Sequence, residues 1–171
     1  MDDTTRLDRW IKWLIVASCV VFILVLALSA VFDPSIRVLH AFQALIYVAV
    51  ILLAWRNSAW GYGAGCLIAA FWNYTNLVHT TFIANGVREL SRALRTGQVQ
   101  NPDQLIAIFA AAAHFILIGA CVAGYARIKP KARWESAKLF GGGVLAIGYF
   151  AGIIIAFGPQ YVPLLKKVFG I

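Results

Sequence analysis

Five apolar stretches, each long enough to cross a lipid bilayer, constrain the fold of this chain more than any other feature. They span approximately residues 11–32, 38–55, 60–83, 105–125 and 139–157. A hydrocarbon core of roughly 30 Å requires about 20 residues of helix. Backbone groups in lipid must be paired within a helix or a closed barrel, and continuous apolar runs do not fit the alternating pattern of a barrel. We therefore expect an all-α integral membrane protein, a bundle of about five transmembrane helices.

The composition supports this interpretation. Apolar residues make up 61% of the chain and charged residues only 13%, whereas soluble domains carry about a quarter charged residues. Basic residues precede the first apolar stretch, as they do in secretion signals, but the stretch is longer than a typical signal core and no clear cleavage pattern follows. We expect it to be a transmembrane helix.

The distribution of basic residues predicts the orientation. With the N-terminus in the cytoplasm, nine Lys and Arg residues lie on the cytoplasmic side and six on the other. The cytoplasmic set is Arg6, Arg9, Lys12, Arg56, Arg127, Lys129, Lys131, Arg133 and Lys138. This excess matches the positive-inside rule, and the net charge of +8 therefore does not indicate a nucleic-acid partner. We predict a multi-pass protein of the cell inner membrane.

The connections indicate a single domain over residues 1–171, with no linker or repeat. Asp33 and Pro34 are placed to cap and begin the second helix. Short connections make the first three helices antiparallel neighbours. After the third stretch, residues 87–95 place apolar side chains on one face and arginines on the other, an amphipathic extension that either stands out of the bilayer or lies in its interface. Residues 160–171 predict a short interfacial C-terminal segment.

Small residues predict where helices approach closely. Alanines and glycines are frequent in residues 107–124, and the last stretch contains Gly141, Gly142, Gly143 and a Gly148-x-x-x-Gly152 pair. Because close packing drives helix association in lipid, we expect these two helices to pack together or against a second copy. A homo-oligomer or a partner membrane subunit is expected in addition to the lipid bilayer.

The most informative polar residues lie in the segment FWNYTNLVHTTFIANG, residues 71–86. Asn73, Asn76 and Thr80 share one face of a helix, and His79 flanks that face. Unpaired amides in hydrocarbon cost several kcal/mol each, so this stripe is expected to point into the bundle. Matching groups on other helices are His40, Gln43 and Tyr47, which share a face, and His114. These eight residues form the predicted ligand site, in the outer half of the membrane.

Four interpretations of this site remain open. The polar groups could hydrogen-bond one another and specify helix register in a non-catalytic subunit of a larger membrane complex. They could line a pocket or pore that binds or conducts a small neutral or weakly polar molecule. His79 and His114 could hold a b-type haem flanked by Phe82, Phe109 and Phe115. The three histidines could instead form a metal site or the active site of an enzyme.

Acidic residues narrow the possible activities. Asp33, Glu89, Asp103 and Glu135 are predicted to lie at helix ends or in loops. Carriers coupled to protons or sodium usually bind the ion with a carboxylate inside the membrane, so such coupling is not expected. No catalytic residues are predicted, and the sequence does not identify a cofactor.

Overall fold

A computed structural model describes residues 3–129 and 132–171, so Lys131 of the predicted cytoplasmic set lies outside the described residues. The described residues form helices and no strand, which confirms the all-α prediction. The α-helices are α1 Asp3–Phe32, α2 Arg37–Trp55, α3 Ala59–Tyr74, α4 Phe82–Thr96, α5 Pro102–Ala126, α6 Glu135–Phe157 and α7 Val162–Phe169. Short 3₁₀ turns, Pro34–Ile36 and Pro159–Tyr161, precede α2 and α7, and a π-helical segment, Thr75–His79, continues α3.

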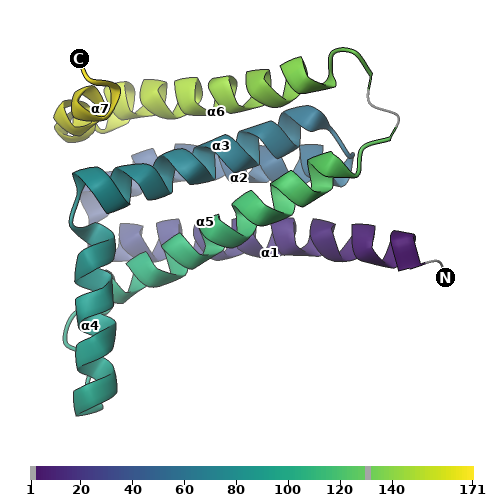
Figure 1. Ribbon diagram of the computed structural model, residues 1–171. Coiled ribbons are helices and arrows are strands. Elements are labelled where there is room, and N and C mark those ends of the chain that lie inside the picture. The colour runs from purple at the N-terminus through teal and green to yellow at the C-terminus, as the bar shows by residue number, and fades with distance from the viewer. Residues whose placement is uncertain (1–2, 130–131) are drawn as a thin grey trace.

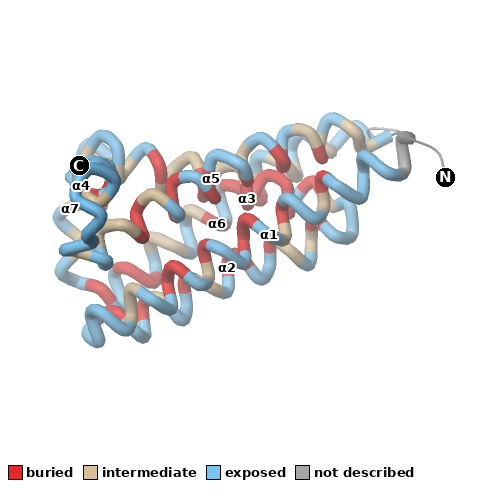
Figure 2. The backbone as a smooth tube through the Cα atoms, turned by 90° about the horizontal axis from the view of Figure 1, so that it is seen from below, coloured by how far each residue is buried: buried red, intermediate tan, exposed pale blue. Residues whose placement is uncertain are grey.

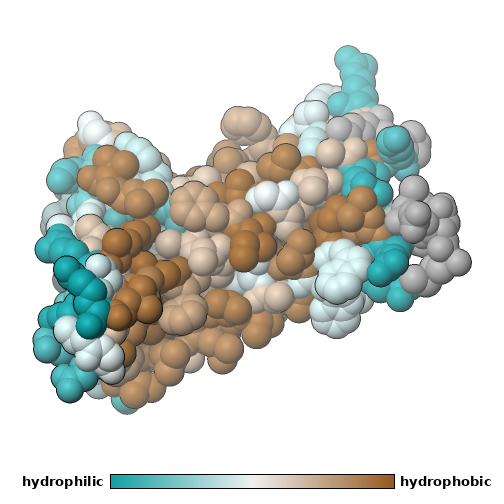
Figure 3. Space-filling view, turned by 60° about the horizontal axis from the view of Figure 1, so that its bottom comes forward, coloured by the Kyte–Doolittle hydropathy of each residue, from teal (hydrophilic) through white to brown (hydrophobic). Residues whose placement is uncertain are grey.

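Four segments within the described residues are long and apolar enough to cross a membrane: Arg6–Phe32, Pro34–Trp55, Pro102–Ala126 and Glu135–Phe157. The α-helical part of α3 has only 16 residues and is not among them. It nevertheless runs alongside the other long helices (Figure 1). The visible surface is apolar over the middle of the bundle and hydrophilic at its two ends (Figure 3), as expected for a protein surrounded by lipid.

Helix α3 lies at the centre of the packing. It contacts α2, α5 and α6, while α1 packs against α2 and α5. Figure 2 shows the buried positions along the facing sides of these helices and the exposed positions on their outer sides. The contacts of α1 with α2 and of α2 with α3 confirm the predicted neighbours.

The expectation that α5 and α6 pack together is wrong, because α6 packs against α3 instead. Glycine explains the preference. A Cβ atom on Gly63 would overlap the backbone of Leu139, and one on Gly142 would overlap the backbone of Trp60. The two backbones therefore approach as closely as glycine allows. The Gly148 and Gly152 positions lie in open space.

The end of the bundle that carries α4 and α7, here called the α4 end, lies opposite the N-terminus (Figure 1). The prediction of a third helix reaching residue 83 is wrong. The helix ends at His79, and α4 starts again at Phe82 and runs across the bundle axis. Asp33 caps the turn before α2 as predicted, accepting a hydrogen bond from the backbone N–H of Ser35 at 3.0 Å.

Candidate functional site

The polar stripe of α3 changes the local backbone. The Asn76 amide donates to the carbonyl of Trp72 at 3.0 Å, and the Thr80 hydroxyl donates to Asn76 Oδ1 at 3.1 Å. The backbone N–H of Phe82 then donates to the Thr80 hydroxyl at 3.2 Å. Side chains that bond nearby backbone groups compete with the helical pattern. This accounts for a π-helical segment and a turn in a region without glycine or proline.

A cavity of about 340 Å³ lies between α1, α2, the π-helical segment, α6 and α7, at the α4 end. Helices α6 and α7 contribute only apolar side chains to its wall, among them Phe150, Ile154 and Leu165. The hydrogen-bonding side chains come from other elements. They are Ser29, His40, Gln43, Trp72, Thr75, Asn76, Thr80 and Tyr161. No acidic residue, Lys or Arg is among the described lining residues.

Four of the eight predicted site residues line this cavity: His40, Gln43, Asn76 and Thr80. His40 Nδ1 lies 3.0 Å from the carbonyl oxygen of Leu26. A carbonyl can only accept, so Nδ1 carries the hydrogen and Nε2 of the neutral ring is an acceptor. The side chain of Gln43 is buried and makes no hydrogen bond within the described residues. These two side chains thus leave both an acceptor and amide groups available to a ligand.

Thr75 is a cavity residue that the sequence analysis missed. Its hydroxyl is buried and has no hydrogen-bond partner among the described residues. At about 100° per residue, Thr75 lies well away from the face predicted for Asn73 and Asn76, and helical spacing alone therefore did not select it. It is the first residue of the π-helical segment and lines the cavity. The wall formed by Leu164, Leu165 and Val168 of α7 was also missed, because the tail was expected to lie in the interface.

Tyr47 and His114 form a separate, fully enclosed pair. The Tyr47 hydroxyl lies 2.7 Å from His114 Nε2, and neither residue is exposed. Trp72 stacks on the His114 ring with centroids 4.7 Å apart, and the Phe22 centroid lies 4.0 Å away. Phe22 and Trp72 also line the cavity, so their rings separate the cavity from the pair. We call these four side chains the aromatic floor.

Asn73 and His79 lie outside both groups. Asn73 is buried as predicted, but its two amide atoms have no hydrogen-bond partner in the described part of the chain. The His79 ring packs edge-on against Tyr74, with centroids 5.2 Å apart. No hydrogen bond or ring contact joins His79 to His114 within the described residues, and the Tyr47 hydroxyl occupies His114 Nε2.

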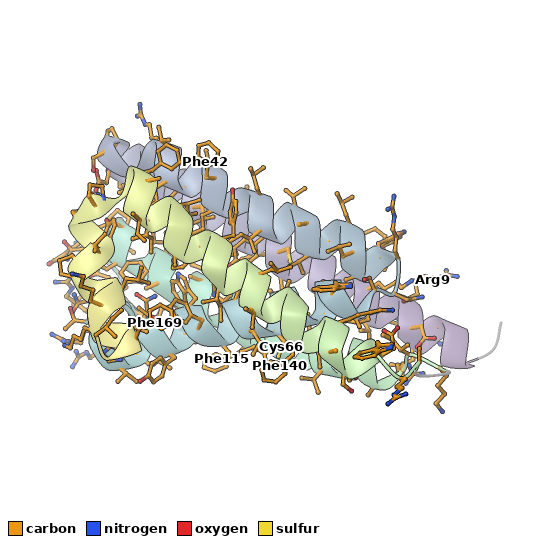
Figure 4. All side chains as sticks on the ribbon, turned by 90° about the horizontal axis from the view of Figure 1, so that it is seen from above. Arg9, Phe42, Cys66, Phe115, Phe140 and Phe169 are labelled. Atoms are coloured by element: carbon orange, nitrogen blue, oxygen red, sulfur yellow. The ribbon has the colours of Figure 1, made fainter. Side chains whose placement is uncertain are left out.

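The environment proposed for a haem or metal is not assembled either. Phe109 and Phe115 are 62% and 57% exposed, and Figure 4 shows Phe115 at the outer edge of the bundle. Phe82 alone of the three expected flanking residues lines the cavity. Within residues 3–129 and 132–171, no three His, Cys, Asp or Glu side chains are grouped as metal ligands.

Comparison of the chain with protein-family models, curated proteins and solved structures gave no match. The interpretation of the site therefore rests on its own geometry.

Proposed function

We propose that this is a multi-pass protein of the cell inner membrane that binds a small, neutral, amphiphilic molecule in the cavity at the α4 end. In this proposal the chain crosses the membrane five times, with α3 and its π-helical continuation as the additional span. The N-terminus is cytoplasmic and the cavity lies in the outer half of the bilayer. The excess of basic residues at the N-terminal end supports this orientation.

The division of the cavity wall is the observation that carries the proposal. Helices α6 and α7 present only hydrocarbon, whereas α2 and the π-helical segment present Gln43, Thr75 and the acceptor nitrogen of His40. A ligand with an apolar body and one hydrogen-bonding group satisfies both walls. The lining holds no charged partner, and an unpaired ion is costly to bury. The polar group of the ligand is therefore neutral, for example an alcohol, an amide or a protonated acid.

The volume sets the size of the ligand. Binding cavities for small molecules range from about 300 to 1,000 Å³, and this cavity lies at the lower end of that range. A two-chain phospholipid does not fit inside it. The aromatic floor supports binding rather than conduction, because Phe22, Trp72 and the enclosed Tyr47–His114 pair pack below the cavity.

Photolabelling with octanol that carries a diazirine group tests the proposal. This probe has the expected chemistry, a neutral hydroxyl on a short apolar chain. After illumination of the protein in lipid nanodiscs, we expect adducts on peptides that contain Gln43 or residues 75–80, and we expect excess octanol to prevent them. Peptide mass spectrometry locates the adducts.

Two matched variants make the test specific. Leu165→Trp adds a large ring to the cavity wall and should abolish protected labelling. Leu145→Trp makes the same change on α6, where the side chain is 64% exposed, and should leave labelling intact. Adducts spread evenly over lipid-facing helices, or equal labelling of both variants, would show that the cavity does not bind the probe.

A further inference from the structure

Helix α4 is the only long described helix that runs across the bundle rather than along it, and it projects beyond the neighbouring helices (Figure 1). Its first half is held against α5, where a Cβ atom on Gly86 would lie 2.8 Å from the carbonyl oxygen of Gln104. Because the long apolar helices run along the membrane normal, a helix that runs across them lies along the membrane surface.

The exposed surface of α4 has two chemically different faces. Val87, Leu90 and Leu94 are exposed, and Leu94 is 79% accessible. Arg88, Arg92 and Arg95 recur at helical spacing on another face. A helix with exposed apolar residues on one face and arginines on another is typical of segments that lie at the boundary between headgroups and acyl chains.

The arginines line a shallow groove of about 490 Å³, together with Asn101 and Gln104. Glu89 also reaches this groove, and its position corrects the sequence analysis, because it lies buried in the middle of α4. Its carboxylate is already engaged. It accepts hydrogen bonds from the backbone N–H groups of Gln100, at 2.7 Å, and Asn101, at 3.1 Å, and forms an ion pair with Arg92.

The charge of Glu89 is thus balanced by Arg92, while Arg88 and Arg95 form no ion pair within the described residues. The groove therefore carries two uncompensated positive charges beside the amide group of Gln104, while the Asn101 amide donates to Glu89 Oε2 at 3.2 Å. Guanidinium groups bind phosphate oxygens through paired hydrogen bonds.

We propose that this groove binds the phosphate of an anionic phospholipid in the leaflet at the α4 end, with the apolar face of α4 directed toward the acyl chains. The site is separate from the cavity and does not depend on the function proposed above. Its ligand chemistry is a phosphodiester, and the lipid source follows from the exposed apolar face beside the arginines.

Native mass spectrometry of the full chain in detergent, with phosphatidylglycerol as the probe, tests the proposal. The Arg88→Gln/Arg95→Gln variant should bind the lipid about 25-fold more weakly, since each basic residue near an anionic lipid surface contributes about fivefold. The matched control is Lys166→Gln/Lys167→Gln. It removes two exposed charges from α7 at the same end, outside the groove, and should bind within about twofold of the unmodified protein.

Circular dichroism should show unchanged helix content in both variants, because all four side chains belong to residues on the surface. Equal losses in the two variants would assign binding to general surface charge, and no loss in either would remove the site. Inorganic phosphate provides a further arm. If it displaces the lipid as effectively as free headgroup phosphodiester does, the groove is a soluble-anion site and the lipid proposal is wrong.

Discussion

Replacing Tyr47 by Phe tests whether the enclosed hydrogen bond to His114 stabilises the bundle. The substitution keeps the ring that packs against Phe22 at 4.6 Å and removes only the hydroxyl, which lies 2.7 Å from His114 Nε2. Nε2 of His114 would then be buried without a hydrogen-bond partner, because the rings of Phe22 and Trp72 surround the imidazole.

Two general magnitudes set limits on the free energy that the Tyr47–His114 hydrogen bond contributes. A buried polar group left unsatisfied costs about 1–3 kcal/mol. Hydrogen bonds between membrane helices average only about 0.6 kcal/mol in double-mutant cycles, with a maximum of about 1.7, because the less folded state also finds partners. Tyr47 and His114 are both fully enclosed and lie on α2 and α5, so we expect a coupling near the upper end, about 1.5 kcal/mol.

The assay is a cycle of Tyr47→Phe, His114→Leu and the double variant, with the free energy of unfolding measured by titration with dodecyl sulfate in mixed micelles. Tyr149→Phe is the matched control. Its hydroxyl donates to the carbonyl of Phe42 at 3.1 Å at a site that is 40% exposed, so we expect a loss below about 0.5 kcal/mol. A Tyr47–His114 coupling below about 0.5 kcal/mol would refute the reasoning that enclosure makes this bond strong.

Two further predictions concern packing and pH. Gly63→Ala should lower the melting temperature markedly, because the added Cβ overlaps the backbone of Leu139 and α6 must move away. Gly148→Ala is the control. Its Cβ meets nothing within 4 Å, so the melting temperature should stay unchanged or rise slightly. Hydrogen bonds from Ser35 lower the pKa of Asp33 below its usual 3.8, so the stability it adds is present above about pH 4 and is lost as pH falls through the folded pKa. Asp33→Asn should remove this component from the pH dependence of unfolding, and an unchanged profile would contradict the assignment.

The sequence alone was sufficient for elements that depend on local chemistry. The apolar stretches predicted the long helices, and Asp33 with Pro34 predicted the turn before α2. The end of the third helix was misplaced because Thr80 and Asn76 bond to backbone groups one turn away, and hydropathy does not register that competition. The polar segment itself was the available signal for an irregular helix.

The sequence predicted only those parts of the candidate site that depend on the spacing of residues within one helix. Facing positions on single helices identified His40, Gln43, Asn76 and Thr80, which all line the cavity. Contacts between side chains of different helices could not be predicted from this spacing. His114 was paired with His79 as a possible haem site, but Tyr47 of α2 is its hydrogen-bond partner. Residue spacing within one helix cannot determine which side chain of another helix comes within hydrogen-bonding distance.

The central position of α3 has a consequence for biosynthesis. About 60 residues separate its end from the start of α6, the helix whose Leu139 packs on Gly63. At translation rates of about 5–20 residues per second, roughly 3 to 12 seconds pass before that partner emerges. During this interval the face of α3 around Gly63 is exposed to lipid or to the insertion machinery. Assembly of the bundle is therefore completed only when α6 has been inserted. A nascent chain halted before that point leaves the α6-facing surface of α3 uncovered.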